Sequence, residues 1–144
     1  MISPNPGEEL KPLNKIASGG ELSRLFLALK RITSTKEGTE TLVFDEVDSG
    51  IGGQTAFVIG KKLKEISCFH QVICITHLPQ IACYGDLHYK VEKTFKKEKT
   101  TTSVKRLEYN ERLKEIARML GSTKITDKSL EHAKEMLASA NYRG

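Results

Sequence analysis

Two short apolar runs on either side of a helical pattern constrain the fold of this chain more than any other feature. Residues 42–44 and 72–75 are unbroken apolar segments of the kind that form strands buried on both faces. Between them, residues 56–63 repeat small and apolar side chains at helical spacing. A strand, a helix and a strand with short connections make a βαβ unit, so we expect two parallel strands joined by a right-handed crossover.

A second helical pattern precedes the first run. Residues 18–21, Ser-Gly-Gly-Glu, have the spacing of a capping box, and the apolar residues after them recur at i, i+3, i+4 and i+7. This pattern predicts a helix from about residue 19 that buries its apolar face. The residues of that face are Leu22, Leu25, Phe26 and Leu29.

The carboxy-terminal part of the chain predicts a hairpin followed by two helices. From residue 87 apolar and polar side chains alternate, and a charged turn leads into a second β-favouring run, which predicts an antiparallel hairpin. Asn110 can cap the next helix, which Gly121 would end, and Thr126 or Asp127 can cap the last one. The alternating apolar residues of the hairpin are Leu87, Tyr89, Val91 and Phe95.

These patterns together predict the fold class. A chain of 144 residues is long enough for one core and short enough to be one domain. We expect an α/β fold with a parallel βαβ core, an antiparallel basic hairpin and two C-terminal helices.

The positive charge of the chain is local. The formal net charge is +5, and residues 90–106 alone hold seven lysines and arginines against two glutamates. Cationic side chains on a hairpin can replace counterions along a phosphate backbone, so this segment can serve to bind nucleic acid. Lysines on an edge strand also prevent sheets from pairing, and that interpretation needs no ligand.

Two carboxylates follow the first apolar run directly. Asp45 and Glu46 stand at the carboxyl end of the expected strand, the edge at which parallel α/β sheets bind ligands. Successive side chains point to opposite faces, so the two acids can do different work. One can hold Mg²⁺ through oxygen or water while the other accepts a proton from an attacking water. A solvated strand end is the alternative interpretation.

Two further stretches can contact phosphate. The glycines of residues 18–21 would let backbone N–H groups approach an anion at the start of a helix, although a simple helix cap explains the same residues. His77 follows the second apolar run and can donate a hydrogen bond to a phosphoryl oxygen, although a lone histidine is commonly structural. The sequence contains no G-x-x-x-x-G-K-[ST] loop, because its one Gly-Lys pair, Gly60-Lys61, is followed by another lysine inside a helical pattern.

The cysteines allow one alternative chemistry. Cys74 and His77 share a C-x-x-H spacing, and Cys83 and His88 could complete a zinc site for a hydrolase. No second paired motif follows them, and cysteines within apolar stretches are more simply buried thiols. We therefore expect reduced thiols rather than a zinc centre.

Taken in order, these segments resemble the ATP-binding-cassette ATPases and, most closely, the SMC-like RecN family of DNA-repair proteins. Residues 15–24 resemble the signature motif and residues 41–46 the Walker B strand. Residues 47–53 resemble the D-loop and residues 75–82 the switch-histidine segment. Each motif is short, but the ordered set is specific. The resemblance implies a partial P-loop NTPase fold, in which residues 1–144 form the carboxy-terminal lobe of an ATPase head.

The resemblance also implies a role for each site residue. Asp45 would bind Mg²⁺ through water, Glu46 would be the general base, and His77 would contact the γ-phosphate of ATP. The signature residues would act on ATP held by a second head, and one acid would line the seam between the heads. The residues expected to bind the nucleotide in this way are Ser18, Gly19, Gly20, Glu21 and Asp48.

By the same resemblance, part of the head lies outside this chain. A RecN head has an amino-terminal lobe with the Walker A loop, and a long coiled coil precedes its signature helix. Residues 1–13 hold three of the four prolines and show no periodicity, so they predict an extended arm at the edge of a fragment. Without the Walker A loop, we expect the isolated chain neither to bind ATP tightly nor to hydrolyse it.

The resemblance implies three kinds of partner: the remainder of the same head, a second RecN-like head in a homodimer, and DNA through the full-length protein in double-strand break repair and recombination. No apolar run approaches the roughly 20 residues that cross a membrane, and the first residues lack a secretory pattern, so we expect a cytoplasmic, nucleoid-associated protein. The alternative is a DNA-binding or dimerisation module that acts through residues 90–106 without catalysis.

Overall fold

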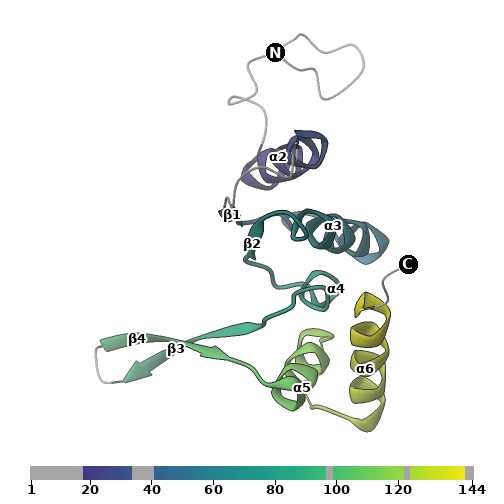
Figure 1. Cartoon of the computed structure of the whole chain (residues 1–144). Coiled ribbons are helices and arrows are strands. Elements are labelled where there is room, and N and C mark those ends of the chain that lie inside the picture. The colour runs from purple at the N-terminus through teal and green to yellow at the C-terminus, as the bar shows by residue number, and fades with distance from the viewer. Residues whose placement is uncertain (1–17, 34–40, 97–98, 122–123, 142–144) are drawn as a thin grey trace.

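The computed structural model describes residues 18–33, 41–96, 99–121 and 124–141 (Figure 1). Residues 1–17 and 34–40 lie outside the described residues. They include the arm expected at residues 1–13 and the first three residues of the signature segment. In chain order the elements are α2 (Gly19–Thr33), β1 (Thr41–Phe44), α3 (Gly53–Ile66), β2 (Gln71–Cys74), α4 (Pro79–Ala82), β3 (Tyr89–Lys96), β4 (Lys99–Arg106), α5 (Tyr109–Met119) and α6 (Asp127–Asn141).

The predicted α/β class and βαβ unit are confirmed. β1 and β2 pair in parallel, with Leu42 opposite Val72 and Phe44 opposite Cys74, and α3 connects the two strands. The apolar stripe of α3 packs against the inner face of β1 and forms the first core. The buried residues of this core are Leu27, Leu42, Phe44, Val47, Ala56, Ile59, Leu63, Ile66 and Ile81.

The expectation that both strands are buried on both faces is wrong. Side chains alternate along β1 between buried and exposed, and Val43 is 57% exposed. On β2 and just beyond it, Ile73 is 47% and Ile75 is 56% exposed. The described helices cover only one face of this two-stranded sheet, so the apolar side chains of the other face remain in solvent.

The helix predicted from residue 19 is confirmed as α2, but its predicted buried face is wrong. Leu27 is buried in the first core, whereas the four residues of the predicted face are exposed: Leu22, Leu25, Phe26 and Leu29. The ring of Phe26 still approaches that of Phe44, with 5.7 Å between their centroids. Helix α2 therefore contacts the sheet through only part of its apolar surface, and the rest of that surface is exposed.

Helices α5 and α6 pack against each other and against the end of α4 around a second core. Thr126 caps α6 as predicted, because its side chain accepts the Ser129 N–H at 3.2 Å. Gly121 follows α5 with a φ of +89°. The predicted Asn110 cap is wrong: α5 begins at Tyr109, and the N–H of Glu108 donates to a Glu111 carboxylate oxygen at 3.2 Å. The buried residues are Cys83, Ile116, Ala117, Ala133, Met136, Leu137 and Ala140.

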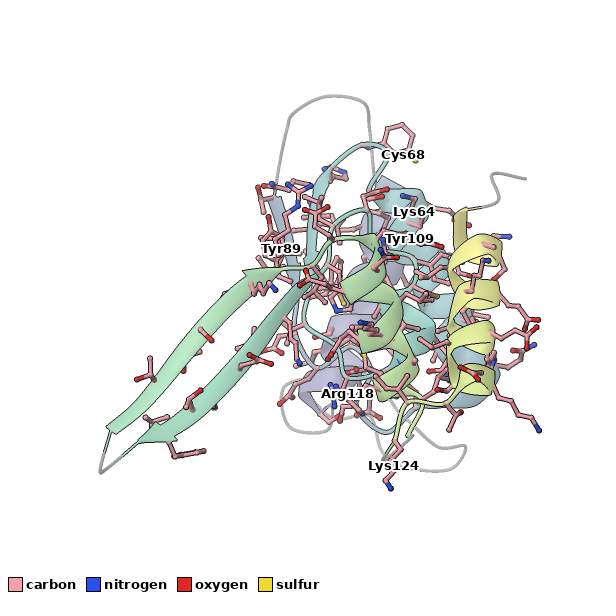
Figure 2. All side chains as sticks on the ribbon, turned by 90° about the horizontal axis from the view of Figure 1, so that it is seen from below. Lys64, Cys68, Tyr89, Tyr109, Arg118 and Lys124 are labelled. Atoms are coloured by element: carbon pink, nitrogen blue, oxygen red, sulfur yellow. The ribbon has the colours of Figure 1, made fainter. Side chains whose placement is uncertain are left out.

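The predicted hairpin is confirmed, but it does not pack on either core. β3 and β4 pair antiparallel from Tyr89 opposite Arg106 to Lys96 opposite Lys99. Figures 1 and 2 show the hairpin extending away from the helices. Its predicted apolar face is accordingly exposed, to 78% at Phe95.

A buried carboxylate fastens the base of the hairpin to α5. Glu115 accepts hydrogen bonds from Arg118 on its own helix at 2.6 Å and lies 3.2 Å from the ammonium nitrogen of Lys90 on β3. Burial raises the pKa of Glu115, but the hydrogen bonds from Arg118 and Lys90 outweigh it and the pKa is lowered. The carboxylate therefore stays charged and holds the strand and the helix together.

No helix within the described ranges is both long and apolar enough to cross a lipid bilayer.

Candidate functional site at the carboxyl end of the parallel strands

The second turn of α2 is hydrogen-bonded to the loop that follows β1. The Ser23 hydroxyl donates to the backbone oxygen of Asp45 at 2.7 Å. The Arg24 guanidinium donates to the backbone oxygens of Ser49 at 2.9 Å and Val47 at 3.3 Å. Because these bonds join residues more than 20 positions apart in the sequence, they fix the start of α2 beside the acidic pair.

The two glycines of α2 make this close approach possible. A Cβ at residue 20 would lie 2.7 Å from the backbone oxygen of Glu46 and 2.8 Å from the Cβ of Ser49. A Cβ at residue 19 would lie 2.8 Å from a carboxylate oxygen of Glu46. The glycines thus admit the loop that carries Glu46, and their approach to an anion stays a prediction.

Ser18 and Glu21 form the capping box that the sequence predicts. The Ser18 N–H donates to Glu21 Oε2 at 2.8 Å, and the Glu21 N–H donates to Ser18 Oγ at 3.3 Å. The Ser18 backbone and hydroxyl bonds lower the pKa of Glu21. Both side chains are therefore used at the helix start, and the nucleotide contact expected of them stays a prediction.

Glu46 is held in an unusual backbone conformation. Its φ is +56°, in the left-handed region that favours glycine. Among the described residues, Glu46 is the only non-glycine residue with a positive φ. The Ser49 N–H donates to the Glu46 carbonyl at 2.9 Å and closes the turn that fixes this conformation. Strain of this kind costs on the order of 1–3 kcal/mol and gathers at functional sites.

The end of β2 lies next to this turn. The Ile75 N–H donates to the Phe44 carbonyl at 2.9 Å, so the parallel pairing continues to the last residue before Asp45. His77 follows two residues later with 75% of its side chain exposed. The loops after the two strands therefore leave the sheet at the same edge, as expected for parallel strands.

Asp48 connects these two loops. Its carboxylate is buried, and one oxygen accepts from the Thr76 hydroxyl at 2.6 Å and the His77 backbone N–H at 2.9 Å. The same oxygen lies 3.0 Å from Nδ1 of the His77 ring. Burial alone would raise the pKa of Asp48, but these hydrogen bonds and the nearby ring hold it below its ordinary value. The carboxylate points into the protein, and its expected place on a seam between heads stays a prediction.

Comparison with known proteins identifies the family. Over 141 residues, 98% of the chain, the sequence is 47% identical to DNA repair protein RecN of Bacillus subtilis. It is 48% identical over 140 residues to RecN of Vibrio cholerae and 47% identical over 144 residues to RecN of Treponema pallidum. The chain belongs to the RecN family. It spans about a quarter of the length of these relatives and matches their carboxy-terminal quarter. No protein-family model matches the chain.

The residues singled out by the RecN resemblance meet at one edge of the sheet. Asp45 and Glu46 leave β1, His77 leaves β2, and Gly19 and Gly20 lie against Glu46. Asp45 is exposed, and one carboxylate with room for water suits Mg²⁺, which keeps several water ligands and otherwise takes phosphate oxygens. The residues present thus fit the ion.

The alternative zinc grouping is not assembled. Among the described residues, no set of three or more histidine, cysteine, aspartate or glutamate side chains lies close enough to hold a metal ion. Burial raises the pKa of Cys74 to about 12 and that of Cys83 to about 11, so both stay protonated thiols near neutral pH. Cys83 packs in the second core, as expected for a buried thiol. The expectation of burial is wrong for Cys68, which is exposed.

Sequence reasoning missed two features of the site. The short helix α4 begins at Pro79 directly after the His77 turn, and a proline at the first helical position was the available signal. The hydrogen bond from Thr76 to Asp48 could not be predicted from the sequence, because the two residues are 28 positions apart.

Proposed function

We propose that this chain is the carboxy-terminal part of an ATPase head of a RecN-type DNA-repair protein and contributes to ATP hydrolysis between two heads. The observation that carries the proposal is the meeting of an acidic pair, a histidine and a glycine-containing helix start at one sheet edge. The P-loop fold, the nucleotide and the homodimer are parts of the proposal.

The chemistry assigns one task to each residue. Mg²⁺, when bound through water by Asp45, would neutralise charge on the phosphates. Glu46 accepts a proton from water as the water oxygen forms a bond to the γ-phosphorus. The bond from that phosphorus to the bridging oxygen breaks, and ADP leaves. His77 contacts the γ-phosphate, while Ser18 and the glycines face ATP of the opposite head.

The bare face of the β1–β2 sheet supports a further part of the proposal. Val43, Ile73 and Ile75 together expose an apolar strip that two strands cannot cover by themselves. In a complete head this strip would pack against the lobe that also brings the phosphate-binding loop. The remainder of the head is therefore the first partner that we propose.

The test uses a RecN protein whose carboxy-terminal quarter is this chain. Glu46→Gln should lower ATP hydrolysis by about 10²- to 10⁴-fold, the usual contribution of a general base, while ATP-bound dimers accumulate. Glu131→Gln, at an exposed position on α6, is the matched control and should hydrolyse ATP at the wild-type rate. Wild-type turnover by the Glu46 variant would remove that residue from its proposed role.

A second candidate function is nucleic-acid binding by the hairpin. The strand register puts Tyr89, Val91, Lys93 and Phe95 on the same face as Arg106. The described side chains of this face are exposed, so aromatic rings that can stack on bases stand beside cations that can contact phosphates. Lys105 is instead paired with Glu111.

Salt dependence tests this second function. Replacing Lys93 and Arg106 with glutamine should weaken binding to single-stranded DNA. The slope of log affinity against log salt should fall by about 0.7 for each phosphate that the variant no longer neutralises. Lys134→Gln on α6 is the control, because that lysine is exposed and lies outside the hairpin. If the variant lacking Lys93 and Arg106 binds with the same affinity and salt slope as the wild type and the Lys134→Gln control, the hairpin is excluded as a binding surface.

A further inference from the structure

The contacts of Asp48 point to a role beyond the known resemblance. One buried oxygen, Oδ2, lies within hydrogen-bond distance of three donor positions: Thr76 Oγ1, the His77 backbone nitrogen and His77 Nδ1, at 2.6, 2.9 and 3.0 Å. An ionised carboxylate accepts hydrogen bonds and donates none, so a proton on the ring nitrogen beside it is favoured over a lone pair. Nδ1 is therefore the ring nitrogen of His77 that lies beside the carboxylate, while most of the side chain is exposed.

The consequence for His77 is a defined outward atom. With Nδ1–H directed at Asp48, the ring presents Nε2 on the side away from the carboxylate. In the neutral ring Nε2 is a hydrogen-bond acceptor, and in the protonated ring it is a second donor. A free histidine in water would interconvert between tautomers and rotamers. The Asp48 contact selects one of these arrangements for a side chain that is otherwise 75% exposed.

Asp48 also fixes the backbone on which the ring stands. The same oxygen takes the His77 N–H, and the Thr76 oxygen that donates to it accepts the Leu78 N–H at 3.0 Å. Leu78 is the N-cap residue of α4. Asp48 therefore links the loop after β1 to the turn after β2. Arg24 binds the same loop, because it donates to the backbone oxygens of the two residues that flank Asp48.

We propose that Asp48 is a positioning residue, which holds His77 as the Nδ1–H form with Nε2 presented to the phosphate group. This inference rests on the proposed function for its meaning in catalysis, but its structural part can be tested without any nucleotide. The alternative role for Asp48 is that of a turn stabiliser, which would fix the backbone of residues 76–78 and leave the ring free.

The structural test is nitrogen NMR of histidine side chains in the full chain. In the wild type, the neutral His77 ring should show a protonated Nδ1 and an unprotonated Nε2. Asp48→Ala removes the acceptor oxygen beside Nδ1, so the ring should lose its preference for the Nδ1–H form. His132, exposed on α6, serves as an internal reference and should not change. A wild-type ring that mixes both tautomers would overturn the proposal.

A second variant separates ring positioning from turn stabilisation. Thr76→Val removes the hydroxyl bond to Asp48 but leaves the carboxylate beside Nδ1, so the Nδ1–H form should persist. Loss of that form in Thr76→Val would assign Asp48 to the turn alone. This variant also keeps the proposal testable if Asp48→Ala does not fold.

The catalytic test uses the same RecN protein as the Glu46→Gln experiment. Asp48→Ala should lower kcat by about 10- to 100-fold, the loss that usually follows when the carboxylate behind a metal-binding histidine is removed, with a smaller change in KM. Adding Asp48→Ala to His77→Ala should cause no further loss, because the acid acts through the ring. Additive losses would overturn the positioning role, whereas absence of ATPase activity in the wild type would reject the proposed function and leave the NMR result unaffected.

Discussion

Replacing Gly60 with alanine should destabilise the protein, although the same change in an open helix is stabilising. Gly60 lies on the buried side of α3, where that helix passes α4. A Cβ there would lie 2.4 Å from Cδ2 of Tyr84 and 2.9 Å from the carbonyl oxygen of Gln80. Ordinary contact begins at 3.4 Å. The ring must therefore move by about 1 Å and the backbone by about half as much, in a close-packed region.

The magnitude follows from two opposing effects. Alanine in place of glycine favours a helix by about 1 kcal/mol. Inserting a methyl group into a packed contact costs about 1–3 kcal/mol, and the upper part of that range applies where a backbone carbonyl must shift. We expect a net loss of about 1–2 kcal/mol in the free energy of unfolding.

Urea denaturation followed by circular dichroism measures this change. Val58→Ala is the matched control, because Val58 is exposed on the same helix and its replacement should change the unfolding free energy by less than about 0.5 kcal/mol. A Gly60→Ala protein as stable as the wild type, or more stable, would refute the close packing of α3 against α4.

Three further outcomes are expected. Lys90→Met should remove the contact with Glu115. Amide hydrogen exchange should then accelerate at the base of the hairpin and stay unchanged in α6. Equal acceleration in both regions would contradict a local role for the Lys90–Glu115 pair. The pKa of Asp48 is lower in the folded protein than in the unfolded chain. The ionised carboxylate therefore stabilises the fold above about pH 3.9, and this stabilisation is lost as the pH falls through the lower folded pKa. Urea denaturation of Asp48→Asn should accordingly show a smaller loss of stability on acidification than the wild type shows. Iodoacetamide should alkylate exposed Cys68 before buried Cys83, with peptide mass spectrometry reporting the order.

Much of the fold could be predicted because its signals are local. Apolar runs at 42–44 and 72–75 and the helical repeat between them specify the backbone of the βαβ unit by themselves. Alternation after residue 87 likewise predicts the hairpin. The same signals mispredicted burial at Val43 and Leu29, because periodicity shows that one side of an element is apolar but not whether another element covers it.

The candidate site divides in the same way. The acidic pair could be located from the sequence because it directly follows an apolar run, and the Ser18–Glu21 cap could be located from its spacing. The contact of Gly20 with the Glu46 loop could not, because it depends on how α2 is docked on the sheet. The partner of His77 depends in the same way on the pairing of two strands.

The amino-acid sequence by itself determined the order and type of the elements and the chemistry carried at the strand ends, since these depend on neighbouring residues and their intrinsic preferences. Only the tertiary structure decided which apolar faces are covered, which glycines are needed for close approach, and that Asp48 faces the ring of His77. Those properties depend on distances between residues remote in the chain. Such distances are set by packing, and no short stretch of sequence encodes them.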